Sequence, residues 1–136
     1  MTAVGPAICS GDTVLVADVG NSRIKLAVVT AAGAIAAPPR LPEIHRRHDL
    51  DSHGFRPADL EQWLQAAAPG PAVVLVASVH DAAAARLEAA LAAVSATSHR
   101  PLRQRRVGHA DLPMAITLAA PERVGIDRLC GAAAAA

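Results

Sequence analysis

Two polar segments, far apart in the sequence, carry residue types that bind phosphates and move protons. A carboxylate such as Asp18 at the end of a buried strand can hold a magnesium ion, usually through water. Gly20 allows a close backbone approach to a phosphate oxygen, and Lys25 can bring a positive charge to a polyphosphate. Because the same residue types also favour ordinary hairpin turns, a plain turn is the alternative. The first segment consists of Asp18, Val19, Gly20, Asn21, Ser22, Arg23, Ile24 and Lys25, the only lysine of the chain.

The second segment lies near the end of the sequence and contains Gly125, Ile126, Asp127 and Arg128. A carboxylate beside an arginine can accept a proton from a substrate hydroxyl while the guanidinium group binds an anion. The alternative is a helix N-terminus at which Asp127 is favourably placed for the helix dipole.

Strands and helices must position both segments, and the pattern of apolar residues predicts where they lie. The predicted order is three strands, a helix, a strand, a helix and a strand, which indicates an α/β fold with a mixed sheet. The turn at 18–22 is expected to join the first two strands as an antiparallel hairpin. We expect an exposed loop at 38–56 and strands at 13–17, 23–29, 34–36, 72–77 and 102–107, with a weaker extended segment at 112–118. One helix is expected to start at Pro57 and to stop at Pro69-Gly70, a second to run from 80 or 81 to 95–98, and a third to cover 125–136.

Composition excludes several classes of protein. The 136 residues are 52% hydrophobic and 18% charged, which suits a folded domain. No apolar run reaches the length of a membrane-spanning helix, so no membrane partner is expected. Cys9 and Cys130 suit reduced thiols, and the N-terminus has no export signal, which favours the cytoplasm. A net charge of +1 and the presence of only two aromatic residues, Phe55 and Trp63, argue against nucleic acid.

Two weaker features suggest other chemistry. His45, His48 and His53 lie close together in the predicted loop and could suggest zinc, although no cysteine accompanies them. Ser78 and His80 lack the glycine-flanked elbow of a serine hydrolase, so that class is disfavoured.

Taken together, the two polar segments resemble the motifs of the type III pantothenate kinases. These enzymes belong to the superfamily of acetate kinase, sugar kinases, Hsp70 and actin. Residues 18–25 match every fixed position of the family's phosphate motif, and Pro121, Val124, Gly125, Asp127 and Arg128 fit its substrate motif. Between them, Ala77-Ser78-Val79 is similar to a Ser-Ser-Val segment at the end of a core strand of the family.

The resemblance implies a ribonuclease H-like lobe of the actin-like ATPase superfamily. The expected lobe covers residues 13–118, with residues 1–12 as an N-terminal extension and residues 119–136 as the truncated start of a second lobe. It also implies a homodimer, and a monovalent cation (K⁺ or NH₄⁺) whose ligand is expected outside this chain.

The implied activity is the ATP-dependent phosphorylation of pantothenate to 4'-phosphopantothenate, the first step of coenzyme A biosynthesis. In this family, residues matching 18–25 bind the ATP phosphates and Mg²⁺, with Asp18 holding the metal through water. Residues matching Gly125, Ile126, Asp127 and Arg128 contact pantothenate. Asp127 then corresponds to the general base, and Arg128 helps to place the substrate.

The sequence also departs from the family pattern. Leu118 and Ala120 stand where the family has a tyrosine and an asparagine. Family members are also nearly twice this long, so this chain is expected to hold half of a two-lobed site. A non-catalytic or regulatory remnant of the fold, or another small-molecule kinase of the superfamily, is therefore the alternative function.

Overall fold

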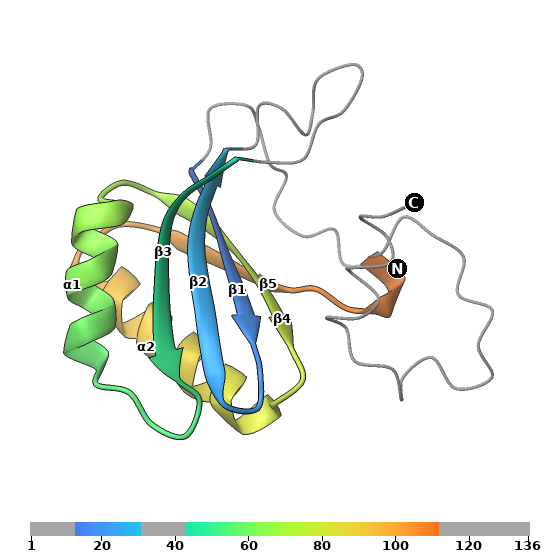
Figure 1. The fold of residues 1–136 in the computed structure, drawn as a ribbon. Coiled ribbons are helices and arrows are strands. Elements are labelled where there is room, and N and C mark those ends of the chain that lie inside the picture. Colours follow the sequence, from blue (N-terminus) through green and yellow to red (C-terminus); the bar gives the residue numbers. More distant parts are fainter. Residues whose placement is uncertain (1–12, 31–42, 112–136) are drawn as a thin grey trace, which may run out of the picture.

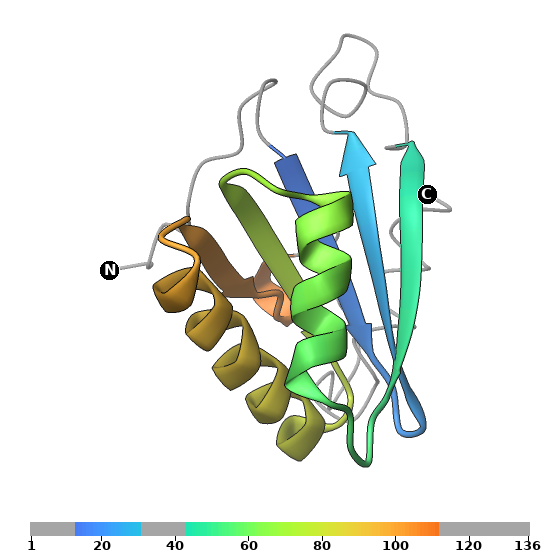
Figure 2. The same cartoon turned by 90° about the vertical axis from the view of Figure 1, so that its left-hand side faces the viewer.

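The centre of the molecule is a five-stranded mixed sheet with two helices packed on one of its faces (Figures 1 and 2). This computed structural model describes residues 13–30 and 43–111. The elements are β1 (Thr13–Val19), β2 (Arg23–Thr30), β3 (Ile44–Asp51), α1 (Pro57–Ala67), β4 (Ala72–Ser78), α2 (Asp81–Thr97), β5 (Leu102–Arg106) and a short 3₁₀ helix, η1 (His109–Asp111).

The strands lie in the order β3-β2-β1-β4-β5. β2 pairs antiparallel with both β1 and β3, whereas β4 pairs parallel with β1 and β5. Because parallel neighbours need crossover connections, α1 lies between β3 and β4 in the chain, and α2 lies between β4 and β5. The predicted α/β class, the antiparallel hairpin and the mixed sheet are confirmed.

The main core lies between the sheet and the two helices. Alternate residues of β1, namely Leu15, Ala17 and Val19, point toward the helices and are at most 2% exposed. The predicted apolar stripes on both helices are confirmed, with Leu64 of α1 and Leu87 of α2 buried at their centres. Neither helix of the described part has the length and apolarity that a membrane crossing requires.

Both helices begin at residues that suit a helix N-terminus. Pro57 occupies the first turn of α1, where its missing N–H removes no helical hydrogen bond. His80 is the N-cap of α2, and its Nδ1 accepts a hydrogen bond from the Ala83 N–H at 3.0 Å. The imidazole therefore satisfies one of the backbone donors that a helix start leaves without a partner.

The prediction of an exposed loop at 38–56 is wrong for Ile44–Asp51, which form the edge strand β3. Among the described residues of this strand only Leu50 is buried, so its side chains show almost no apolar alternation. The strand is held by backbone hydrogen bonds with β2, and charged side chains do not prevent this pairing. Edge strands often carry such charges, which oppose pairing with other chains.

Other boundaries differ by a few residues. β1 continues to Val19, so the turn contains only Gly20, Asn21 and Ser22, and Asp18 belongs to the strand. β4 extends to Ser78, one residue past its predicted end. The predicted elements at 34–36, 112–118 and 125–136, and the proposed lobe boundary at 118, lie outside the described residues.

The arginines of β5 pair with neighbouring carboxylates. Arg105 forms an ion pair with Asp111, and Arg106 forms one with Glu88 of α2. A hydrogen bond from the Gly108 N–H, together with Arg105, lowers the pKa of Asp111. The hydrogen bond to Glu88 raises the pKa of Arg106. Nearby carboxylates therefore offset part of the basic charge along this strand.

The residue after the C-cap of α2 offers a test of the fold. His99 adopts a positive φ of 52°, and its side chain makes no hydrogen bond or ion pair with any described residue. Because glycine has no Cβ penalty in this conformation, His99→Gly is expected to raise the free energy of unfolding by about 0.5–1 kcal/mol. Urea denaturation would measure the change. His99→Ala is the control, and an equal gain in that variant would contradict the explanation.

Candidate phosphate-binding site

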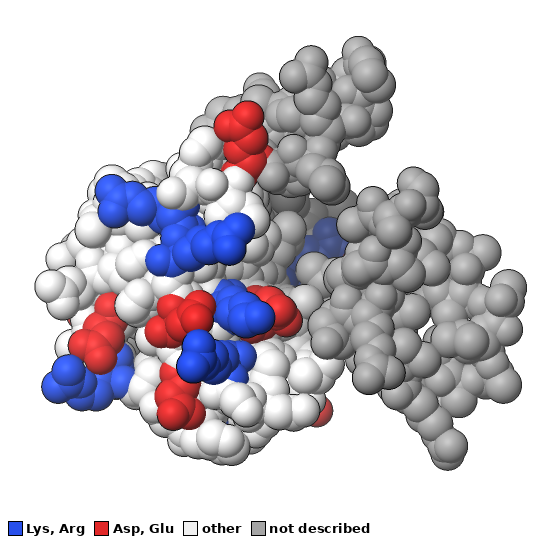
Figure 3. All heavy atoms as spheres, in the orientation of Figure 1, with Lys and Arg blue, Asp and Glu red and all other residues white. Residues whose placement is uncertain are grey.

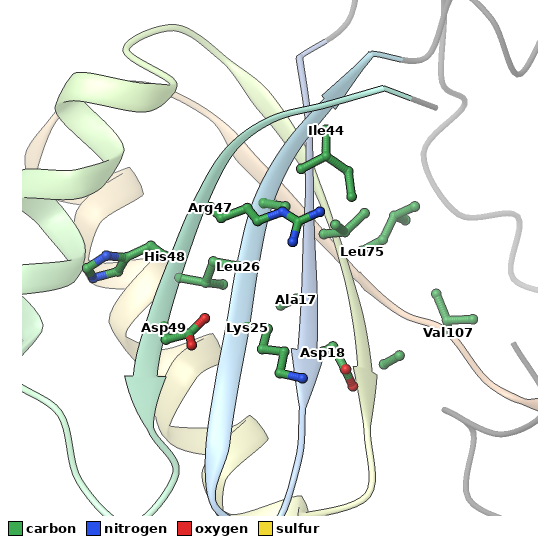
Figure 4. A pocket seen from close by; sticks show the side chains of 13 residues that line it. Ala17, Asp18, Lys25, Leu26, Ile44, Arg47, His48, Asp49, Leu75 and Val107 are labelled. Carbon is green, nitrogen blue, oxygen red and sulfur yellow. The ribbon is translucent and has the colours of Figure 1, made fainter. Parts of the chain in front are cut away.

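The hairpin between β1 and β2 brings the two charged ends of the first motif together. Asp18 of β1 lies directly opposite Lys25 of β2 in the antiparallel register. Residues opposite each other in such a pair point to the same side of the sheet. Ala17 and Val19, on either side of Asp18, face the helices. Asp18 and its partner Lys25 therefore lie on the other face, where Figure 4 shows Lys25 extending toward Asp18.

Both charged groups are exposed and have no partner among the residues that the structure describes. The Asp18 carboxylate and the Lys25 ammonium group form no hydrogen bond or ion pair with each other or with any other residue in 13–30 and 43–111. The Asn21 and Ser22 side chains of the turn are likewise without partners in the described part of the chain. Opposite charges facing each other across a strand pair would ordinarily interact. Here these polar groups remain available to a ligand.

The turn itself is tight. The Gly20 N–H donates a hydrogen bond to the Arg23 carbonyl at 2.9 Å. A Cβ atom at Gly20 would lie 3.2 Å from that same oxygen, which is closer than most side chains tolerate. The structure therefore gives an internal reason for glycine here, besides the predicted close approach of a phosphate.

Residues that directly follow β4 and β3 donate hydrogen bonds to carbonyl groups in and next to this turn. The Val79 N–H, just after β4, donates to the Val19 carbonyl at 3.0 Å. Ser52, just after β3, donates from its N–H to the Ser22 carbonyl at 3.0 Å and from its Oγ to the Gly20 carbonyl at 2.7 Å. The turn is thus supported by residues that come from both of its sides in the sheet.

Charged and apolar residues form two rows on the face of the sheet away from the two helices, around a cavity of about 960 Å³ (Figure 4). The row next to the turn is Asp49, Lys25, Asp18 and Ala77, and the next row is Arg47, Ala27, Val16 and Leu75. This arrangement combines an apolar floor with a charged rim near the turn.

Sequence reasoning missed Arg47 and Asp49 because it placed them in a loop. Asp49 forms an ion pair with Arg23 at 3.5 Å, whereas the Arg47 side chain has no partner among the described residues. Their only signal was a short alternation with His48 and Leu50. On the face shown in Figure 3, cationic and anionic side chains are interspersed, so no single sign of charge dominates it.

The structure places the remaining predicted residues as follows. Val19 and Ile24 are buried and anchor the hairpin in the core, and Arg23 is exposed beside the turn. The substrate segment, with Gly125, Ile126, Asp127 and Arg128, lies outside the described residues.

The histidines considered for zinc do not gather into a site. His48 stacks on Trp63 with ring centroids 5.5 Å apart, and His53 packs edge-on against His80 at 6.2 Å. Within 13–30 and 43–111, no three histidine, cysteine or acidic residues are grouped as metal ligands.

A mixed sheet of this strand order, with both helices on one face and a polar hairpin between its first two strands, is the fold of a lobe of the actin-like ATPase superfamily. The chain belongs to the type III pantothenate kinase family, whose sequence profile matches residues 14–136. That match includes both polar segments and identifies the chain as part of a kinase family. No curated protein matches the chain.

Proposed function

We propose that the protein transfers the γ-phosphoryl group of ATP to the primary hydroxyl of pantothenate, which gives 4'-phosphopantothenate for coenzyme A synthesis. The observation that carries this proposal is the hairpin at 18–25, which presents Asp18 and Lys25 on one face without partners among residues 13–30 and 43–111. Membership of the type III pantothenate kinase family supports the choice of substrate.

The residues of the hairpin fit a magnesium–nucleotide complex. Mg²⁺ in kinase sites is typically held by one or two carboxylates together with phosphate oxygens, and Asp18 offers one carboxylate that is unpaired within the described part of the chain. Bound Mg²⁺ would neutralise charge on the phosphates. Lys25 supplies a second positive charge, and the Gly20–Ser22 turn lets backbone donors approach phosphate oxygens. Val19 and Ile24, both 0% exposed, hold this hairpin against the core.

The substrate segment supplies the acceptor side of the reaction in this proposal. Asp127 accepts the proton of the pantothenate hydroxyl, and Arg128 positions the substrate, with Gly125 and Ile126 as further contacts. Phosphoryl transfer depends mainly on positioning and charge neutralisation, so one carboxylate at the attacking oxygen suits this role. A homodimer and a monovalent cation, K⁺ or NH₄⁺, complete the proposed enzyme.

A substrate panel tests this function. The protein that carries this chain is incubated with ATP, Mg²⁺ and either pantothenate or one of several other small alcohols and acids. Mass spectrometry is expected to detect one added phosphoryl group on pantothenate and none on the other compounds.

Two outcomes would contradict the proposal. Phosphorylation of another compound with pantothenate inert would assign the protein to a different kinase activity. Nucleotide binding without turnover on any compound would indicate a regulatory or binding role. The second outcome bears on Leu118 and Ala120, which replace residues that the family has before its substrate motif.

A further inference from the structure

Ser52 is the most deeply buried polar residue in the described part of the chain. Its exposed fraction is 0%, although it immediately follows an edge strand whose side chains are mostly exposed. Buried hydroxyl groups are expected to have hydrogen-bond partners, because an unpaired one costs free energy. The partners of Ser52 therefore indicate why a serine is present at this position.

The hydrogen bonds of Ser52 connect the turn at Gly20, Asn21 and Ser22 to both β3 and α2. Its Oγ donates to the Gly20 carbonyl at 2.7 Å, and its N–H donates to the Ser22 carbonyl at 3.0 Å. Its own carbonyl accepts a hydrogen bond from Arg86 of α2. Both peptide oxygens that bracket Asn21 and Ser22 are thus bound to one residue.

The local chain is shaped to turn Ser52 inward. The Asp51 carboxylate accepts a hydrogen bond from the His53 N–H at 2.8 Å, the pattern of an Asx turn. This turn begins where β3 ends, so its position depends on the pairing of β3 with β2. The Ser52 hydroxyl therefore reaches the Gly20–Ser22 turn from an Asx turn that directly follows β3.

The planar peptide bond between Gly20 and Asn21 links the direction of the Gly20 carbonyl to that of the Asn21 N–H. In a planar trans peptide, the carbonyl and the following N–H point in opposite directions. Because Ser52 fixes the Gly20 carbonyl on the buried side, the Asn21 N–H is directed away from Ser52. That N–H has no hydrogen-bond partner in residues 13–30 and 43–111. An oriented, unpaired backbone donor beside Asp18 and Lys25 is suited to a phosphate oxygen.

We propose that Ser52 is a positioning residue for phosphate binding, because its buried hydroxyl holds the Gly20 carbonyl and thereby aims the Asn21 N–H at the ATP phosphates. The inference rests on the proposed kinase function only for the identity of the ligand. The hydrogen bonds themselves belong to the structure of the chain, so they can be tested without turnover.

Ser52→Ala removes the hydroxyl and leaves the backbone bonds in place. We expect kcat/KM for ATP to fall by about 10–100-fold, because small errors in the position of phosphate donors are costly. The KM for pantothenate is expected to change by less than about twofold, because the Gly20–Ser22 turn is proposed to contact ATP and not pantothenate. Ser52→Thr keeps a hydroxyl and is expected to recover most of the lost activity.

Ser95→Ala is the matched control. The Ser95 hydroxyl, in the last turn of α2, also donates to a backbone carbonyl at 2.7 Å, that of Arg100, but this contact lies beside the start of β5, the edge strand opposite β3 in the sheet. The control variant is expected to lose stability while keeping its KM for ATP. Equal effects of the two alanine variants on kcat/KM for ATP would overturn the positioning role.

Amide hydrogen exchange separates this inference from the proposed function. In the 136-residue chain, Ser52→Ala is expected to speed exchange at the Gly20 N–H, whereas Ser95→Ala leaves it unchanged. Unchanged exchange at Gly20 in the Ser52 variant would overturn the inference whatever the enzyme's substrate. Faster exchange in a protein that does not phosphorylate pantothenate would contradict only the proposed function.

Discussion

Replacing Asp127 by asparagine is expected to lower the kcat of pantothenate phosphorylation by about 10²–10⁴-fold, the usual contribution of a general base. The amide retains the size of the side chain but cannot accept the hydroxyl proton. The KM values for ATP and pantothenate are expected to change by less than about threefold, because the lost interaction belongs to the transition state. Steady-state kinetics with both substrates varied would measure the split.

Glu122→Gln is the control for this prediction. Glu122 is a nearby acidic residue that follows Pro121 and is not among the residues proposed to contact pantothenate, so the variant is expected to retain wild-type kcat. Unchanged turnover in Asp127→Asn would remove the general-base role. A rise in the KM for pantothenate with unchanged kcat would instead assign Asp127 to substrate binding.

Asp18→Asn has the second large expected effect. The substitution removes the carboxylate proposed to hold Mg²⁺ through water, and kcat is expected to fall by about 10²–10³-fold at ordinary magnesium concentration. Raising the magnesium concentration is expected to restore part of the activity, because the phosphates of ATP still bind the ion. A magnesium titration of the initial rate at saturating ATP and pantothenate would test both statements.

Stability provides the control for Asp18. The side chain is exposed and has no partner in the described part of the chain, so Asp18→Asn is expected to leave the melting temperature nearly unchanged. Asp59→Asn, which removes an exposed ion pair between α1 and its N-cap residue Arg56, is expected to leave the magnesium dependence at its wild-type value. Wild-type magnesium dependence in Asp18→Asn would contradict the proposed metal role.

Much of the fold follows from local sequence patterns. The apolar runs of β1 and β4, the helical stripes around Leu64 and Leu87, and Pro57 at the start of α1 each have a strong physical signal. β3 has no such signal, because its residues are mainly charged and it is held by backbone hydrogen bonds with β2. Backbone pairing does not depend on residue type, so the strand could not be predicted from its composition.

The candidate site shows the same division. Residue types and spacing predicted that Asp18, Gly20 and Lys25 belong to a phosphate-binding hairpin. The sequence could not show that both charges would point to the face away from the helices and lack partners among the described residues. Nor could it show that Arg47 and Asp49 line the same cavity, because their place depends on the pairing of β3.

The sequence by itself therefore determined the α/β class, the antiparallel hairpin, the resemblance to type III pantothenate kinases and the residues proposed for chemistry. These properties depend on residue type and on short spacings along the chain. Only the tertiary structure decided how the hairpin is held: Ser52 reaches the Gly20 carbonyl from 32 residues away. A backbone carbonyl carries no residue signature, so the sequence does not reveal which side chain binds it until the sheet has formed.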